Sequence, residues 1–280
     1  MERIKQAIER ARAERAEPIT SATESTASKP AKLNTAARAT PAPSDVVYHS
    51  TKTIPADPEH LRAHRVLTGA SDEPSAVAYK VLRTKVLQSM RSNGWQTLAI
   101  TGTRKGNGKT LTTINLGISL AHEVNQTVLL ADLDLRQPRM ASYLAAEELP
   151  GLSDYLLGRV ELSEILFHPG FDRLVVLPGH EPLLNSSEAL SSPKMTRLVE
   201  ELKNRYQDRI ILFDLPPLFA GDDVIAFAPN VDAILLVLED GQTTRTDLKR
   251  AYELLDPKRI IGTILNKATP EKEGHESAYY

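Results

Sequence analysis

The sequence of 280 residues contains no cysteine and no long apolar run. Without cysteine it has no disulfide, no thiolate zinc site and no cysteine nucleophile. Its apolar runs all fall short of the roughly 18 residues that a bilayer-spanning helix needs. The charged N-terminus, MERIKQAIERARAERA, lacks the apolar centre of a signal peptide. These absences predict a soluble intracellular protein.

The charge of the chain is almost balanced, with a formal net charge of -2. This balance argues against a broad nucleic-acid-binding surface, so we expect no nucleic-acid partner. Hydrophobic residues make up 41% and charged residues 25% of the chain, which are ordinary values for a globular protein. The composition therefore predicts at least one domain with a buried core.

The two ends of the chain differ in composition from its centre. Residues 1–16 carry a thin apolar stripe at helical spacing, which fits a solvated helix as well as a helix that docks on a partner. Residues 17–56 are rich in Ala, Ser, Thr and Pro and predict a flexible linker, because they offer little apolar surface to offset chain entropy. We expect a folded domain over residues 57–267 and a flexible tail over residues 268–280.

Short apolar runs alternate with longer amphipathic segments in the centre of the chain. The apolar runs are residues 97–102, 127–135, 173–179, 209–217, 233–240 and 260–267. The amphipathic segments with helical spacing are residues 75–90, 109–123, 192–206 and 244–255. Continuous apolar runs are typical of strands covered on both faces, and their alternation with helices predicts a parallel sheet. The expected fold class is α/β, a three-layer sandwich with a mostly parallel central sheet.

A glycine-rich segment, TGTRKGNGKTLTTINLG, follows the first apolar run. It contains the second half of a Walker A motif, GNGKT, whereas Thr103 stands where the usual pattern has its first glycine. Such a loop surrounds phosphates with backbone N–H groups, its lysine reaches the β- and γ-phosphates, and its threonine hydroxyl ligates Mg²⁺. The same sequence pattern also occurs in glycine-rich turns that bind no nucleotide, but the predicted strand before it and the predicted helix after it favour nucleotide binding. The predicted nucleotide contacts are Gly106, Asn107, Gly108, Lys109, Thr110 and Leu111.

Aspartates occupy the ends of two other apolar runs. Asp132 and Asp134, in TVLLADLDLRQPRM, stand two residues apart and so share one face of a strand end. Asp214, in RIILFDLPP, follows four apolar residues in the manner of a Walker B carboxylate that secures Mg²⁺. A D-x-D pair alone is also found at polar strand ends and in metal-dependent glycosyltransferases. Together with the phosphate loop, the two motifs predict a site for ATP and Mg²⁺ at the carboxyl edge of the sheet, in a fold of the P-loop NTPase type.

This set of motifs resembles the bacterial tyrosine kinases that regulate capsule and exopolysaccharide synthesis, which are related to septum-site and partition ATPases. The resemblance runs from about Ala78 to Lys267. It includes AYKVLRTKV, GNGKT, LLADLDLRQP, GLSDYLLG, LPGHEPLLNSSEALSSPKM, IILFDLPPLFAGDD and GTILNK. The chain departs from the family at Arg104-Lys105, where a proline is common, and at Val77, where the family has a carboxylate used in ring assembly.

The resemblance implies roles for individual residues. The catalytic residues would be Lys109, Asp132, Asp134 and Arg136. The metal ligands would be Thr110, Asp132, Asp134 and Asp214. Asp132 would act as the base that activates a tyrosine hydroxyl. Arg136 fits either a residue that steers phosphate charge or a surface arginine, and Asn266 fits either an adenine contact or a turn-forming asparagine.

The resemblance also implies a function. It indicates an ATP-dependent protein-tyrosine autokinase that phosphorylates Tyr279 and Tyr280 in trans and regulates exopolysaccharide or capsule synthesis and export. The alternative is an ATP-dependent switch or scaffold without kinase activity. The implied partners are a second copy of the chain and, as activator, an inner-membrane polysaccharide chain-length (co-polymerase) protein. Such a partner would hold a cytoplasmic protein at the inner face of the cell membrane.

Overall fold

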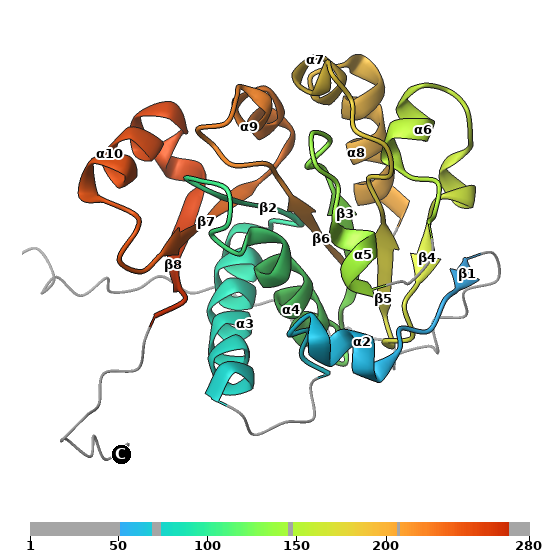
Figure 1. Ribbon diagram of the computed structural model, residues 1–280, viewed down its shortest axis with the longest axis horizontal. Helices are drawn as coiled ribbons and strands as arrows, with labels where there is room; N and C mark the ends of the chain where they lie inside the picture. The colour runs from blue at the N-terminus through green and yellow to red at the C-terminus, as the bar shows by residue number, and fades with distance from the viewer. Residues whose placement is uncertain (1–50, 69–73, 145–147, 206–207, 269–280) are drawn as a thin grey trace, which may run out of the picture. The chain divides into compact units, whose positions relative to one another are not determined.

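One mixed sheet forms the centre of the protein, which a computed structural model describes over residues 51–68, 74–144, 148–205 and 208–268 (Figure 1). The order of its strands is β1-β4-β5-β3-β6-β2-β7-β8. The strands are β1 Lys52–Thr53, β2 Thr97–Gly102, β3 Thr127–Asp132, β4 Phe167–His168, β5 Leu174–Leu177, β6 Arg209–Asp214, β7 Ala233–Glu239 and β8 Ile260–Asn266. Every neighbouring pair is parallel except β4 and β5. The predicted mostly parallel sheet is confirmed.

Helices cover both faces of this sheet. They are α2 Pro58–Ala63, α3 Pro74–Asn93, α4 Lys109–Ala121, α5 Met140–Leu144, α6 Leu152–Leu156, α7 Ser186–Leu190, α8 Pro193–Arg205, α9 Asp223–Phe227 and α10 Arg245–Leu254. Along β3, Val128 and Leu130 pack in a core with α2 to α5, whereas Leu129 and Ala131 pack in a second core with α6 to α10. Figure 1 shows α3 and α4 together on one side of the sheet. The three-layer sandwich expected from the sequence is therefore confirmed.

The four longest helices lie where the amphipathic segments predict them. In α8, for example, the buried residues are Met195, Leu198, Val199 and Leu202, which recur at the spacing of one helical face. The sequence analysis did not predict α2, α5, α6, α7 or α9, each of which has five or six residues. Segments this short contain too few residues for a helical period to stand out.

The first described residues belong to the sheet, although the sequence predicts a linker there. Lys52–Thr53 forms the edge strand β1, paired with β4, within the segment expected to be linker. Residues 1–50 and 269–280 lie outside the described residues. The N-terminal helix, the rest of the linker and the tail with Tyr279 and Tyr280 therefore stay predictions. Among the described helices, none has the length and apolar character that a membrane span requires.

The strand order brings three loops to one edge of the sheet. β2 lies between β6 and β7, and β3 lies between β5 and β6. Because all these strands are parallel, their carboxyl ends meet at the same edge. The register pairs Asp132 of β3 with Asp214 of β6, and Ile100 of β2 with Asp214. The phosphate loop and both strand-end acidic motifs are thereby neighbours.

Candidate functional site

The loop between β2 and α4 has the backbone shape of a phosphate-binding turn. Gly106 and Gly108 have φ angles of 90° and 86°, in the left-handed region that favours glycine. A Cβ atom at Gly108 would lie 2.2 Å from Nδ2 of Asn266. Helix α4 begins directly after this loop, at Lys109, and its thirteen residues direct the positive end of the helix dipole at the loop. The loop can therefore surround an anion with N–H groups.

A cavity of about 250 Å³ lies against this loop. Its lining residues are Lys105, Gly106, Gly108, Lys109, Thr110, Leu111, Asp134, Arg136, Gln137, Arg139, Tyr143, Pro216, Pro217 and Ala220. Lys109 is only 7% exposed, and it forms no ion pair with any described residue. A buried ammonium group without a partner ion is poised to take up an anionic ligand such as a phosphate.

Two buried carboxylates, Asp132 and Asp214, adjoin this cavity. Oδ1 of Asp132 accepts a hydrogen bond from the backbone N–H of Asp134 at 3.1 Å. Its Oδ2 accepts from the N–H groups of Arg139 at 2.9 Å and Met140 at 2.8 Å. These bonds hold the carboxylate of Asp132 in one orientation and tie the DLDLRQP loop to the end of β3.

The pKa of each of these carboxyls is raised. Burial raises the pKa of Asp132 to about 7, with a further increase from the charge of Asp134, while the backbone hydrogen bonds oppose it. Burial also raises the pKa of Asp214 to about 8, and the nearby charge of Asp132 adds to that increase. The charge of Lys109 opposes the shift at Asp214. Near neutral pH the two carboxyls together retain a proton, because two ionised carboxylates this close would repel each other. A cation bound here would stabilise the fully ionised pair, and an ionised carboxylate of the pair can take a proton from a substrate.

The residues at this edge fit a bound Mg²⁺ of the P-loop type. Oγ1 of Thr110 donates a hydrogen bond to Oδ2 of Asp214 at 2.6 Å, so a hydroxyl ligand and a strand-end carboxylate face one another. Oγ1 of Thr113 lies 3.4 Å from Oδ1 of the same carboxylate. Among the described residues, no group of three or more His, Asp or Glu side chains is arranged to hold a metal ion. Mg²⁺ in nucleotide sites needs only one or two carboxylates, because phosphates and water supply the other ligands.

Asp134 and Arg136 both line the cavity but differ in their surroundings. Burial raises the pKa of Asp134, and the charge of Lys109 opposes this shift. The guanidinium of Arg136 forms an ion pair with Asp223 at 2.8 Å and donates to Oγ of Ser186 at 3.2 Å. Arg136 is therefore held against α9 at the rim of the cavity, on the side of Ala220.

Asn107 and Asn266 lie behind the phosphate loop and do not line the cavity. Oδ1 of Asn107 accepts a hydrogen bond from the N–H of Arg104 at 2.6 Å, which closes the loop on itself. Nδ2 of Asn266 donates to the carbonyl oxygen of Asn107 at 2.8 Å. The side chain of Asn107 thus supports the loop from within, and Asn266 supports it from β8. The adenine contact suggested for Asn266 stays a prediction.

The structure therefore divides the predicted site residues into three groups. Those that line one cavity are Gly106, Gly108, Lys109, Thr110, Leu111, Asp134 and Arg136. Asp132 and Asp214 lie buried beside them, and Asn107 and Asn266 support the loop. The roles assigned to all of these residues stay predictions.

Sequence reasoning missed several residues that line the cavity. Arg139 lies within the quoted motif, five residues after Asp134, but its cationic side chain was not singled out. Pro216 and Pro217 directly follow the Leu215 that comes after β6, and they have no polar side chain that would indicate a place in a site. Tyr143 has no local signal in the sequence, because α5 brings it to the cavity from outside every motif.

Comparison with known proteins finds a family profile and several tyrosine-protein kinases that are similar to this chain. The profile of the AAA-domain family matches residues 95–245. Tyrosine-protein kinase CpsD of Streptococcus agalactiae serotype Ia is 30% identical over 194 residues, which are 68% of this chain and 82% of that protein. Tyrosine-protein kinase Etk of Escherichia coli K12 is 33% identical over 205 residues, 70% of this chain but only 27% of that longer protein.

Solved structures with the same fold include kinase domains. The kinase domain of Escherichia coli Etk aligns with a TM-score of 0.66 at 27% identity, over 82% of this chain and 94% of that domain. The kinase domain of VpsO aligns with a TM-score of 0.60 at 31% identity, over 69% of this chain and 96% of that domain. In both alignments, nearly the whole of the kinase domain has a counterpart in this chain.

Proposed function

The chain belongs to the AAA-domain family and to the bacterial protein-tyrosine kinases, and we propose that it transfers the γ-phosphoryl group of ATP to Tyr279 and Tyr280 of a second copy of itself. The observation that carries the proposal is the convergence of three elements at one edge of the sheet. These are the glycine loop before α4, Asp132 at the end of β3 and Asp214 at the end of β6. A phosphate site beside a buried carboxyl with a raised pKa is what transfer to a weakly acidic hydroxyl requires.

The loop and Lys109 would bind the phosphates. The left-handed conformation of Gly106 and Gly108 would let backbone N–H groups face the phosphates, and the ammonium group of Lys109 would pair with the β- and γ-phosphate oxygens. Thr110 and Asp214, with Asp134 and Asp132, would hold Mg²⁺. When bound, that ion supplies charge that stabilises the phosphates and the transition state.

Asp132 would accept the proton of the acceptor hydroxyl. In the transfer, the phenolic oxygen forms a bond to the γ-phosphorus, the bond from that phosphorus to the β–γ bridging oxygen breaks, and ADP leaves. The phenolic proton passes to the carboxylate of Asp132. A base whose pKa lies near 7 is ionised for a large part of the time at neutral pH and still accepts a proton well.

The acceptor tyrosines lie close enough in sequence for this role. The 13 residues from 268 to 280 span at most about 40 Å when extended, at roughly 3.3 Å per residue. We infer that this length lets the tail of one copy enter the site of an adjacent copy. Each phosphate added to Tyr279 or Tyr280 would bring about -1.5 to -2 charge at neutral pH, which would favour release of the tail from its position beside the carboxyls of Asp132 and Asp214.

The cellular role follows from the resemblance set out above. We infer regulation of capsule or exopolysaccharide synthesis, with an inner-membrane chain-length (co-polymerase) protein as activator. Residues 1–16, as an amphipathic helix, and residues 17–56, as a linker, would tether the domain of residues 57–267 to that partner. The protein would then be cytoplasmic and peripheral to the inner face of the membrane.

A two-chain assay tests the proposal directly. One full-length chain carries Tyr279→Phe and Tyr280→Phe and acts as kinase; the other carries Lys109→Ala and acts as acceptor. We expect phosphotyrosine at residues 279 and 280 of the Lys109→Ala chain only when the first chain, ATP and Mg²⁺ are all present. Replacing Lys258, an exposed lysine just before β8, by Ala in the kinase chain is the matched control and should leave transfer unchanged.

Peptide mapping by mass spectrometry provides the readout. Phosphotyrosine in wild-type chain alone, with none in the mixture, would show transfer within one chain. The kinase proposal fails if wild-type protein forms no phosphotyrosine even with the cytoplasmic segment of a co-polymerase added. Binding of ATP without transfer would then identify a nucleotide-dependent switch.

A further inference from the structure

A second cavity, of about 510 Å³, adjoins the nucleotide site on the side of Asp132. Its lining residues are Asp132, Pro138, Arg139, Ala141, Ser142, Glu148, Leu149, Gly179, His180, Glu181 and Pro182. Arg139 lines both cavities, whereas Asp132 lines only the second. If nucleotide phosphates occupy the first cavity, a hydroxyl that gives its proton to Asp132 has to arrive through the second.

The loop after β5 forms one wall of this second cavity. A Cβ atom at Gly179 would lie 2.6 Å from Cβ of Pro138 and 3.4 Å from Cγ of Asp132, so the loop passes directly against the carboxyl of Asp132. The next residue, His180, has a φ of 73°. This left-handed conformation costs a residue other than glycine roughly 1–2 kcal/mol. Residues held in such a conformation occur frequently at functional sites.

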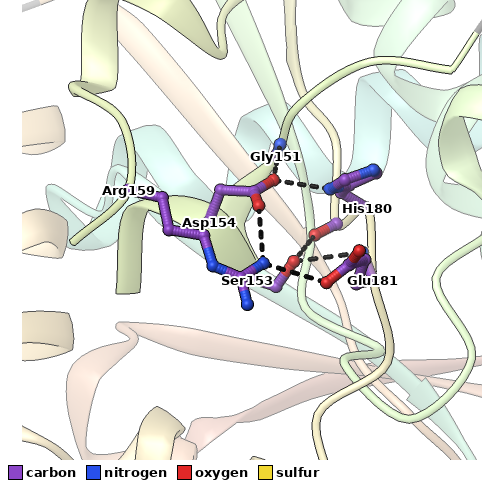
Figure 2. Close-up of polar contacts among 7 residues, drawn as sticks. Gly151, Ser153, Asp154, Arg159, His180 and Glu181 are labelled. Carbon is purple, nitrogen blue, oxygen red and sulfur yellow. Dashed lines mark hydrogen bonds and ion pairs between the residues drawn. The ribbon is translucent and has the colours of Figure 1, made fainter. Parts of the chain in front are cut away.

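Asp154 of α6 holds the side chain of His180 in place. Figure 2 shows the Asp154 carboxylate between Gly151, Arg159 and His180. It accepts hydrogen bonds from the N–H of Gly151 at 2.9 Å, from Nη1 of Arg159 at 3.2 Å and from Nδ1 of His180 at 2.5 Å. Burial opposes the ionisation of Asp154, but these hydrogen bonds outweigh it and lower its pKa. An ionised carboxylate is only an acceptor, so Nδ1 carries the proton and donates it.

Nε2 is the remaining polar atom of the His180 ring. It has no hydrogen-bond partner among the described residues. The ring lines the second cavity and is only partly exposed to solvent. The ring is therefore fixed at one nitrogen and available at the other. A carboxylate that orients a histidine in this way is a common device for presenting the second nitrogen to a substrate.

We propose that His180 binds the acceptor: its Nε2 hydrogen-bonds the tyrosine-bearing peptide in the second cavity, and Asp154 is a positioning residue that acts through His180. This inference rests on the proposed kinase function and identifies where its peptide substrate lies. The bond fixes the peptide main chain or a polar side chain next to the acceptor tyrosine, so that the phenol reaches Asp132. The loss of His180 then weakens acceptor binding and leaves ATP binding intact.

A purely structural role makes a different prediction. If His180 only tied the loop after β5 to α6, its replacement would change stability and affect both substrates alike. His180→Gly removes the ring and relieves the left-handed strain. His180→Asn tolerates the same φ and keeps a donor that can reach Asp154, but has no counterpart of Nε2. Arg205→Gln is the matched control, because it removes an ion pair to Glu201 on α8 and neither residue lines the cavity.

The experiment uses the full chain with Tyr279→Phe and Tyr280→Phe as kinase and a synthetic peptide of residues 268–280 as acceptor. KM for the peptide, KM for ATP, kcat and the unfolding midpoint are measured for each variant. We expect His180→Asn and His180→Gly to raise the peptide KM about 3- to 10-fold, the effect of one lost hydrogen bond. The ATP KM should stay unchanged, kcat should stay within about twofold, and Arg205→Gln should behave like the parent.

A double-mutant cycle tests the assignment of Asp154. Asp154→Asn should raise the peptide KM in the parent chain but not in the His180→Gly background, because it acts through the ring. Normal transfer with an unchanged peptide KM in both His180 variants would overturn this inference alone. Absence of transfer by the parent chain, with the peptide and with the Lys109→Ala acceptor, would overturn the proposed function and this inference with it.

Discussion

Replacing Asp214 by Asn removes one of two neighbouring buried carboxyls and should change how stability depends on pH. Burial and the nearby Asp132 raise the pKa of Asp214 from its ordinary 3.8 to about 8. Between these two values, the folded protein holds a proton that the unfolded chain has released. Because the folded state binds more protons, its stability falls as the pH rises through this window.

The size of the effect follows from the number of retained protons. One retained proton lowers the free energy of unfolding by about 1.4 kcal/mol for each pH unit. From pH 5 to pH 7, the proton on Asp214 therefore accounts for roughly 3 kcal/mol. Asn is nearly isosteric, and its carbonyl oxygen can still accept the hydrogen bond from Thr110. In the Asp214→Asn variant, the unfolding free energy should keep only the part of its pH dependence that Asp132 contributes.

Urea unfolding of nucleotide-free, Mg²⁺-free protein at pH 5, 6, 7 and 8 measures this difference. Asp222→Asn is the matched control: it removes the same formal charge from the same edge, but its side chain is 72% exposed. It should keep the wild-type slope. Parallel profiles for wild type and Asp214→Asn would refute the reasoning, because they would mean that Asp214 ionises normally in the folded protein.

Three further substitutions test other parts of the structure. Gly108→Ala places a Cβ atom 2.2 Å from Nδ2 of Asn266 in a left-handed backbone, so it should cost at least about 1 kcal/mol of unfolding free energy and weaken ATP binding in calorimetry. Adding Asn266→Ala should restore part of that stability. Asp232→Ala removes the acceptor of hydrogen bonds from the N–H and hydroxyl of Thr97 and should cost about 1–3 kcal/mol in urea unfolding. Burial opposes the ionisation of Asp232, but its hydrogen bonds lower the pKa below 3.8, so this cost should shrink as the pH falls through that range. Phe213→Ala opens a cavity in a fully buried core and should cost about 3–5 kcal/mol; a loss below 1 kcal/mol would contradict the packing of β6.

Local patterns in the sequence predicted most of the large elements. The runs from Thr97 to Gly102 and from Arg209 to Asp214 are buried along their whole length, and a strand covered on both faces is mostly apolar. The long helices carry one apolar face, which produces a regular spacing. The strands β1 and β4, at one end of the sheet, have two residues each and no such pattern, so only pairing with neighbouring strands defines them.

The candidate site was predictable in its composition but not in its arrangement. The glycines of the loop follow from the letters GNGKT, because left-handed backbone angles favour glycine. The supporting contact from Asn266 to Asn107 joins residues 159 positions apart, and nothing in the local sequence around either residue indicates it. Arg136 was open between two interpretations, and only the structure shows its ion pair with Asp223.

The sequence by itself determined the fold class and the chemistry of the nucleotide loop, because periodicity and backbone preference are local properties. Only the tertiary structure decided which side chains meet. The strand order makes Asp132 and Asp214 neighbours, and their shared burial raises both pKa values. The contact of Asp154 with His180 likewise depends on α6 packing against the loop after β5. Burial and hydrogen bonding between distant segments arise only when the chain folds.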